Sequence, residues 1–221
     1  MVNGYNQNLK CDYRDRRESL KGEVERQLIH LFTGVALIFL IRTTGDIALP
    51  VLVFLLVFYA AFSVVIMLNM LPLSLSSFLC RWGRPSKQTI PLKGTILLLC
   101  GVTLSFALFP EEIACASIAI VALGDSVATA IGVLIGRHKL PYSGKKTVEG
   151  TLSGMIAAFL VASFFVTPVQ AFIGSAGGML LESVIDIQTI REFNSQMIFN
   201  FFLNDNFLIP LFSGLLMFII T

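Results

Sequence analysis

Two aspartates in this chain lie in polar motifs within or beside apolar segments. Asp125 belongs to Gly124-Asp125-Ser126, inside an apolar run, and Asp205 belongs to Asn204-Asp205-Asn206, just before the last apolar run. A carboxylate near membrane depth is costly unless it faces water, a cation or a partner. Mg²⁺ binds one or two acids together with substrate phosphates. We therefore predict Asp125 and Asp205 as ligands of Mg²⁺ or another divalent cation, the alternative for Asp205 being an ordinary helix cap.

A basic loop leads into the apolar segment that starts near residue 150. It carries four basic residues and ends at a glycine: Arg137, Lys139, Gly144, Lys145, Lys146 and Gly150. Helix N-termini present free N–H groups and a partial positive charge, and they bind phosphate oxygens. The loop is not a Walker A motif, because Lys139 replaces its first glycine and Lys146 replaces its Ser or Thr. We predict that it binds the phosphates of a nucleotide, and an ordinary basic cytoplasmic loop is the alternative.

Further ionisable residues occupy unusual positions. Glu23, Arg26 and His30 are spaced three and four residues apart, so they share one helical face. A solvated helix beside the membrane is the alternative explanation for that face. Glu149 stands where the basic loop enters the membrane, and Glu182 is a third acid within an apolar run.

Small residues surround Asp125 at helical spacing. Steps of three and four residues place one stripe on a single side of a helix, made of Ala122, Asp125, Thr129, Gly132 and Gly136. Close packing of membrane helices accounts for the glycines. Packing does not account for the aspartate, which favours a functional Asp125.

The composition is typical of a membrane protein. Of the 221 residues, 55% are apolar and 14% are charged, whereas soluble domains carry roughly a quarter charged residues. Apolar runs such as 51–68 and 152–166 approach the length of a transmembrane helix. A net charge of +2 is too balanced for a nucleic-acid-binding protein. The four cysteines show no CxxC spacing, which excludes a zinc site or a disulfide framework.

These patterns predict an all-α, polytopic integral membrane bundle of about seven transmembrane helices. The expected spans are 27–41, 47–70, 94–109, 113–135, 150–167, 170–185 and 207–221. With a cytoplasmic N-terminus, fifteen of the sixteen Lys and Arg residues fall on the inner side and only Arg42 lies outside, as the positive-inside rule expects. Residues 1–26 then form a cytoplasmic segment without a signal peptide, and residues 27–221 form one transmembrane domain. Because the inner connections are the long ones, we expect any chemistry at the cytoplasmic face.

Together the motifs resemble the family of CTP-dependent dolichol kinases, phytol kinases and eukaryotic-type diacylglycerol kinases. The resemblance spans residues 23–210 and is carried in order by Glu23-x-x-Arg26-Gln27-x-x-His30, Leu123-Gly124-Asp125-Ser126-Val127-Ala128, Gly132, Gly136-Arg137, Lys146-Thr147-Val148-Glu149-Gly150-Thr151, Glu182 and Asn204-Asp205-Asn206-x-x-x-Pro210. Three positions depart from the family pattern: Gln27 replaces Lys, Thr151 replaces Ser and Asn204 replaces Asp.

The resemblance implies transfer of the terminal phosphate of CTP to the hydroxyl of a polyprenol- or dolichol-type lipid alcohol. It implies catalytic roles for Asp125, Asp205, Glu149 and His30, with Mg²⁺ on the two aspartates and Glu149 orienting a lysine or the metal. It implies donor contacts from Lys145, Lys146, Thr147, Arg26, Gly124, Ser126, Gly150 and Asn206. The implied partners are the lipid alcohol, the nucleotide and the bilayer of a prokaryotic cell membrane or eukaryotic endoplasmic reticulum.

Other functions stay open at this point. A diacylglycerol or phytol kinase belongs to the same family, and apolar contacts discriminate weakly among lipid alcohols. A lipid cytidylyltransferase would use the same donor and cation but would release pyrophosphate instead of CDP. A small secondary transporter would bind ions at its intramembrane acids. Transporters of that kind often have repeated halves, and this chain shows no such repeat.

Overall fold

In this computed structural model the chain is helical throughout its described part. The structure describes residues 16–68, 92–143, 146–185 and 204–221, with side chains from residue 24 onward. Within these ranges it contains no strand, and an isolated bridge pairs Lys139 with Thr147. The prediction of an all-α fold is confirmed for this part of the chain.

Helices cover all seven segments that the apolar pattern marks out. In chain order the described elements are α1 (Arg16–Thr44), η1 (Gly45–Ile47), α2 (Ala48–Met67), α4 (Lys93–Leu108), α5 (Glu111–Ala119), η2 (Ile120–Asp125), α6 (Ser126–Ile135), α7 (Val148–Ala162), α8 (Pro168–Ile185) and α11 (Asp205–Ile219).

Local sequence explains where several helices begin. Thr147 is extended, and its Oγ1 accepts a hydrogen bond from the Gly150 N–H at 3.2 Å, so it caps α7. Asn204 caps α11 in the same way through the Asn206 N–H, at 3.1 Å. Pro168 opens α8, where its fixed φ suits the first helical position.

The helical segment that contains Asp125 includes one stretch of π-helix. α5 continues into the π-helical element η2, which ends at Asp125, and η2 continues into α6. Such widened turns are frequent at functional sites. The irregular stretch also changes which partner each side of the segment faces. Ala122 lies against Gly34 of α1 whereas Gly132 lies against Thr147, so the predicted stripe does not face a single neighbour.

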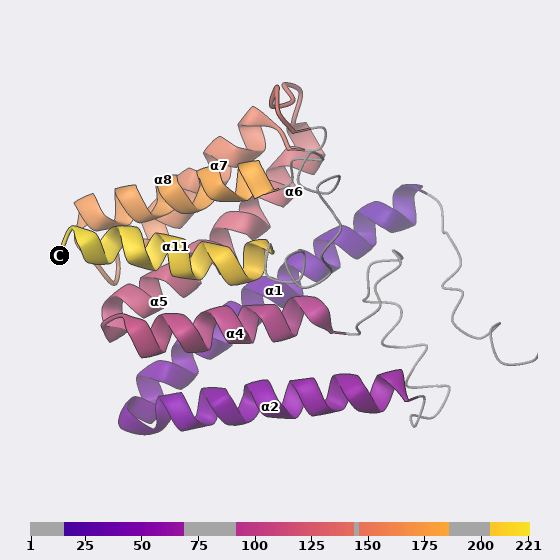
Figure 1. Cartoon of the computed structure of the whole chain (residues 1–221). Helices are drawn as coiled ribbons and strands as arrows, with labels where there is room; N and C mark the ends of the chain where they lie inside the picture. The colour runs from indigo at the N-terminus through magenta and orange to yellow at the C-terminus, as the bar shows by residue number, and fades with distance from the viewer. Residues whose placement is uncertain (1–15, 69–91, 144–145, 186–203) are drawn as a thin grey trace, which may run out of the picture.

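The helices form a bundle with two distinguishable ends (Figure 1). α11 packs between α8 and α4, α7 packs against α6, η2 and α8, and α1 crosses η2 and α6. The chain reverses direction at η1, where Gly45 adopts a left-handed φ of 53° that suits glycine, and α2 returns along α4. The starts of α4, α7 and α11 and the ends of α6 and α8 lie toward one end, on the right of Figure 1.

Small residues allow α7 to approach η2 and α6 closely. A Cβ added to Gly154 of α7 would lie 2.7 Å from both the carbonyl oxygen of Gly124 and the Cβ of Ala128. Gly124 in turn lies against Met179 of α8. Small residues spaced four apart are a common way for membrane helices to pack, and here they bring three segments together around Asp125.

Three stretches of the described chain are long and apolar enough to cross a membrane: Val24–Met67, Glu111–Ile135 and Pro168–Ile185. The first of these holds both α1 and α2. The helices α4, α7 and α11 have 16, 15 and 15 residues, which is short of the roughly 20 residues that a full crossing needs. By length and composition the described chain therefore contains three candidate spans rather than the predicted seven.

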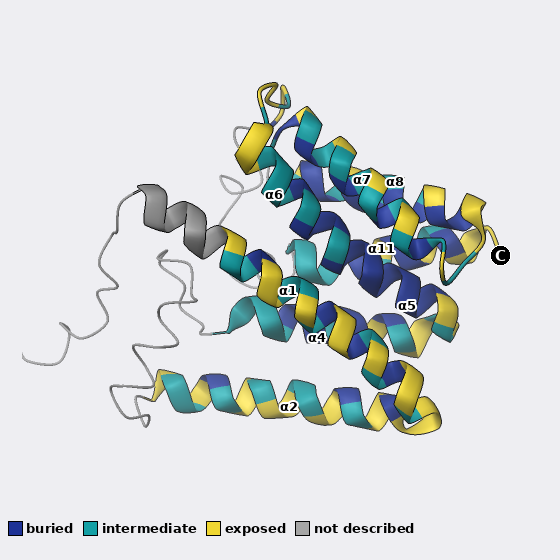
Figure 2. Cartoon of the chain, turned by 180° about the vertical axis from the view of Figure 1, so that it is seen from behind, coloured by how far each residue is buried: buried dark blue, intermediate teal, exposed yellow. Residues whose placement is uncertain are grey.

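The outer faces of α1 and α2 are apolar. Figure 2 shows exposed residues along both helices, and these include the large side chains of Phe32, Phe39, Phe54, Val57 and Phe58. An extended apolar surface of this kind marks contact with lipid or with another protein. Together with the long apolar helices it indicates an integral membrane protein.

Candidate functional site

Three charged side chains from separate segments meet inside the bundle. Lys146, just before α7, forms an ion pair with Glu182 of α8, and its Nζ lies 3.9 Å from Oδ1 of Asp125 at the end of η2. Both acids are buried, with 8% of Asp125 and 3% of Glu182 exposed. Thr129 Oγ1 also donates to Oδ1 of Asp125, at 3.3 Å. We call Asp125, Lys146 and Glu182 the buried charge cluster.

The surroundings of Lys146 are electrostatically negative. Burial alone would lower the pKa of Lys146, but the carboxylates of Glu182 and Asp125 outweigh burial and raise it. Asp205, at the start of α11, adds to the same effect from a greater distance. Lys146 therefore stays protonated at neutral pH. When Asp125, Glu182 and Asp205 are all ionised, three negative charges face its single positive charge.

One oxygen of the cluster has no hydrogen-bond partner. Glu182 Oε1 accepts from Lys146 Nζ, whereas Glu182 Oε2 is buried and makes no hydrogen bond with the described residues. A buried polar atom without a partner costs on the order of 1–3 kcal/mol, and more when it is charged. This oxygen is therefore able to accept a further cation or donor.

The loop that carries Lys146 is fixed on both sides. The Lys146 N–H donates to Ser143 Oγ at 3.1 Å, and the Lys146 carbonyl accepts from the Leu140 N–H at 3.0 Å. Tyr142 is hydrogen-bonded to Ser183 of α8, with 3.1 Å between their hydroxyl oxygens. The bond between Tyr142 and Ser183 joins the loop to α8. From the loop, the Lys146 side chain reaches Glu182 of α8.

Thr147 and Gly150, predicted to bind the donor, form the cap of α7. The Gly150 N–H is bound to Thr147 Oγ1, and the Thr147 side chain lies against Gly132 and Gly136. In this structure the predicted phosphate-binding N–H of Gly150 is thus used within the protein. Donor binding by these two residues stays a prediction.

Gly124 and Ser126 connect the central segment to its neighbours. Ser126 Oγ lies 2.6 Å from the carbonyl oxygen of Ala122 and 3.1 Å from that of Gln27, which joins α6 to α1. Gly124 leaves the space that Met179 fills. Both residues lie beside Asp125 in sequence, and their described contacts are within the protein.

α1 brings His30 to the same region. Gln27 contacts Ser126 and Gly34 contacts Ala122, and His30 lies between these positions on the same face of α1. His30 Nε2 is buried and makes no hydrogen bond with the described residues. A catalytic role for His30 stays a prediction.

Asp205 and Asn206 open α11 at the same end of the bundle. The Asn206 N–H donates to Asp205 Oδ1 at 2.8 Å and to Asn204 Oδ1 at 3.1 Å. Asn206 Nδ2 donates to the carbonyl oxygen of Gly94 at 3.2 Å, which joins α11 to α4. Asp205 acts on Lys146 electrostatically but forms no ion pair with it among the described contacts.

Glu149 contacts His138 instead of Lys146. Its Oε1 lies 2.6 Å from His138 Nδ1, and both carboxylate oxygens accept from the His138 N–H at 3.2 Å. Among the described contacts Glu149 forms no ion pair with Lys146, and the expectation that it orients a lysine or the metal stays a prediction. Its carboxylate instead holds the turn that leads into α7.

Three predicted positions contribute less to this geometry. Arg26 is half-buried on α1, one residue before Gln27. Lys145 lies outside the described residues, as does the side chain of Glu23. Their predicted roles stay predictions.

The oxygen ligands of the buried charge cluster suit a hard cation. Mg²⁺ prefers carboxylate oxygens and needs only one or two of them when phosphates and water complete its shell. In the described part of the chain no group of three or more His, Cys, Asp or Glu side chains is arranged to hold a metal ion. Glu182 Oε2, which has no hydrogen-bond partner among the described residues, and Asp125, whose Oδ1 lies 3.9 Å from the same Lys146 Nζ, fit the smaller ligand set of Mg²⁺.

Glu182 lies outside the predicted site set, although its side chain is central to the cluster. An ionisable residue within an apolar segment is the signal that marks it in the sequence. Its partner could not be read from the sequence, because Lys146 is 36 positions away and reaches Glu182 only through the packing of α7 on α8.

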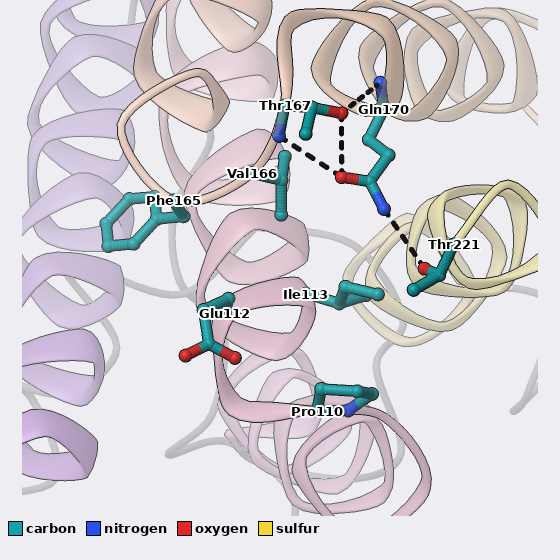
Figure 3. Close-up of a pocket in the computed structure, with 8 residues that line it drawn as sticks. All are labelled: Pro110, Glu112, Ile113, Phe165, Val166, Thr167, Gln170 and Thr221. Carbon is teal, nitrogen blue, oxygen red and sulfur yellow. Dashed lines mark hydrogen bonds between the residues drawn. The ribbon is translucent and has the colours of Figure 1, made fainter.

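A separate cavity of about 480 Å³ lies near the C-terminus, at the opposite end of the bundle. It is lined by Pro110, Glu112, Ile113, Phe165, Val166, Thr167, Gln170 and Thr221 (Figure 3). Gln170 Oε1 accepts from the N–H and hydroxyl of Thr167 at 3.1 and 2.8 Å, and Gln170 Nε2 donates to Thr221 Oγ1 at 3.0 Å. The last of these bonds joins α8 to the C-terminal residue after α11. None of the predicted site residues lines the cavity.

Comparisons with known proteins leave the family open: no family model, no curated protein and no solved structure matches the chain.

Proposed function

We propose that this chain is a membrane lipid-alcohol kinase that transfers the terminal phosphate of a nucleoside triphosphate, with CTP as the expected donor, to a polyprenol- or dolichol-type alcohol. The observation that carries the proposal is the buried charge cluster, in which Lys146 lies between Asp125 and Glu182. Phosphoryl transfer requires a protein chiefly to position its reactants and to neutralise charge. The cluster supports both requirements. Its lysine would bind phosphate oxygens, and its carboxylates would bind a cation.

Donor binding is proposed at the end of the bundle where α7 and α11 begin. Lys146 and Arg26 would bind the phosphate oxygens, and Asp125 and Asp205 would hold Mg²⁺. The bound cation would neutralise charge on the phosphates. The negative surroundings of Lys146 agree with a site that requires a cation before a polyanion can enter.

In the proposed transfer the hydroxyl oxygen of the lipid forms a bond to the terminal phosphorus. The bond between that phosphorus and the bridging oxygen breaks, and the nucleoside diphosphate leaves. The hydroxyl proton requires an acceptor within hydrogen-bond distance. His30 is the proposed acceptor, because its Nε2 is buried and makes no hydrogen bond with the described residues, on the face of α1 that packs on η2 and α6.

The acceptor is proposed to approach along α1. This helix carries His30 on its inner face, and the exposed Phe32 and Phe39 lie on its outer side. A lipid alcohol beside α1 would keep its apolar chain on lipid-exposed surface and bring its hydroxyl toward the buried charge cluster. Apolar contacts of this kind tolerate several chain lengths, so diacylglycerol and phytol are alternative acceptors.

We propose a cytoplasmic site in a seven-pass topology. Near the site, helix ends and loops carry the basic residues Arg26, Lys93, Arg137, Lys139 and Lys146. At the opposite end Arg42 is paired with Glu111 at 3.0 Å, and Asp46 and Glu112 add negative charge. This asymmetry among the described residues agrees with the positive-inside rule. Local thinning of the bilayer would allow the short helices to cross.

A product assay tests the proposal. Purified protein is incubated with Mg²⁺, with CTP or ATP labelled in the terminal phosphate, and with a polyprenol, phytol or diacylglycerol. We expect label in the lipid phase and a nucleoside diphosphate in the aqueous phase. Pyrophosphate release with a lipid phosphate as substrate would instead identify a cytidylyltransferase. Unlabelled lipid with both donors and every alcohol would contradict a kinase.

A further inference from the structure

The ammonium group of Lys146 lies where a bound cation would contact two buried carboxylates. It pairs with Oε1 of Glu182 and is 3.9 Å from Oδ1 of Asp125. Only 11% of the Asp125 side chain and 2% of the Glu182 side chain are exposed. Two carboxylates in such surroundings repel each other strongly unless a positive charge lies between them.

The lysine satisfies this pair of acids incompletely. Glu182 Oε2 is buried and makes no hydrogen bond with the described residues. One ammonium charge faces two nearby carboxylates, with Asp205 contributing a third negative charge. A divalent cation would bring more positive charge and a coordination shell that uses several oxygens at once.

We propose that Asp125 and Glu182 together form a divalent-cation site, that Lys146 fills this site when no cation is bound, and that cation entry releases Lys146. Glu182 is thus a cation ligand in addition to the predicted pair of aspartates. The inference rests on the proposed function only for the identity of the physiological cation, Mg²⁺. The competition itself follows from the positions of the three side chains.

Release gives Lys146 a second position in which it can act. Its side chain belongs to the loop before α7, and the backbone contacts of Lys146 with Ser143 and Leu140 do not depend on its ammonium group. The side chain can therefore leave Glu182 while the loop stays in place. A released lysine at this end of the bundle is available to a phosphate group, so cation binding would prepare the site for the nucleotide.

Mn²⁺ binding to the full-length protein, measured by electron paramagnetic resonance without nucleotide or lipid, tests the competition. Lys146→Met should tighten Mn²⁺ binding about tenfold, because the variant removes the positive charge that competes with the cation for the two carboxylates. Glu182→Gln should weaken it by a similar factor, since it removes a charge with little change in shape. Glu112→Gln at the opposite end of the bundle is the matched control for the loss of a carboxylate, and it should bind Mn²⁺ like the unmodified protein.

A second measurement uses the unmodified protein and does not depend on the folding of a variant. An amine-acylating reagent is applied with and without Mg²⁺, and modification of each lysine is quantified by peptide mass spectrometry. Mg²⁺ should increase modification of Lys146 several-fold, whereas the exposed Lys139 should react equally in both conditions.

The outcomes separate this inference from the proposed function. The inference would be overturned if folded Lys146→Met bound Mn²⁺ no more tightly than the unmodified protein. It would also be overturned if Mg²⁺ did not increase the modification of Lys146. Either result would count even if the protein were an active kinase. Tighter binding in Lys146→Met together with weaker binding in Glu182→Gln would support it even if no lipid phosphate is formed.

Discussion

Lys146 is proposed to act at two stages of the reaction. In the structure it is paired with Glu182 and lies near Asp125, and in the proposal it contacts the donor phosphates once the cation is bound. Lys146→Ala should therefore raise the KM for CTP about tenfold, since a hydrogen bond to a charged group contributes on the order of 1.5–3 kcal/mol. Initial rates measured over a range of CTP concentrations check this expectation.

The control for this substitution is Arg42→Ala, which removes an exposed basic side chain at the opposite end of the bundle. It should leave the KM for CTP unchanged. A Lys146→Ala enzyme with an ordinary KM for CTP would show that Lys146 does not bind the donor.

At the scale of single residues, the sequence predicts the members of the site better than their pairing. Asp125 and Lys146 stand out because an acid in an apolar run and lysines before a helix are costly or unusual placements. Lys146 contacts Glu182 and not Glu149, which is only three residues away. That choice depends on the packing of α7 against α8, and no local pattern encodes it.

At the scale of the elements, the close contact between α7 and η2 positions Asp125. Gly154 leaves no room for a methyl group, because an added Cβ would lie 2.7 Å from the carbonyl oxygen of Gly124. Gly154→Ala should lower the free energy of unfolding by about 1–3 kcal/mol, although alanine favours helices more than glycine. Thermal unfolding in detergent measures the change.

Gly94→Ala is the matched substitution at the start of α4. Its added Cβ would have only an ordinary contact, 3.5 Å from Asn206 Nδ2, so its unfolding midpoint should stay the same or rise. Equal stability of the two variants would show that close packing at Gly154 does not constrain the bundle.

Helix positions are the part of the fold that the sequence predicts best. Apolar runs mark the helices, and residues such as Thr147, Asn204 and Pro168 mark where they begin. The π-helical stretch that ends at Asp125 was not predicted. A run of apolar residues does not distinguish an α-helix, with hydrogen bonds between residues four apart, from a π-helix, with hydrogen bonds between residues five apart. The predicted stripe of small residues meets two neighbours, because Ala122 lies against Gly34 of α1 and Gly132 lies against Thr147 and Gly150.

At the scale of the whole molecule, the two ends of the bundle should face opposite sides of the membrane. In a chain whose four native cysteines are replaced by serine, Asp46→Cys should react with an impermeant maleimide in intact cells. Lys139→Cys should react only after the membrane is permeabilised, since the positive-inside rule places its loop in the cytoplasm. The opposite pattern would place the proposed site outside the cell and away from cytoplasmic nucleotides.

The number of membrane crossings shows where sequence patterns are least informative. Seven apolar segments were predicted as spans, and their described residues are largely helical, yet within the described part of the chain three stretches are long and apolar enough by themselves. The length of a helix does not determine whether it crosses, because tilt, bilayer thinning and burial against neighbours compensate for a short one. These properties belong to the assembled bundle and not to any single segment.

We propose that Asp125 and the rest of the buried charge cluster carry out phosphoryl transfer to a lipid hydroxyl. The most direct measurement compares lipid labelling from terminally labelled CTP in the unmodified protein, in Asp125→Asn and in Asp46→Asn, an exposed control at the opposite end. Asp125→Asn should remain folded in detergent and lose at least about a hundredfold in rate, as expected for the loss of a key electrostatic group. Asp46→Asn should keep full activity. Undiminished lipid labelling by folded Asp125→Asn would contradict the assignment of the site.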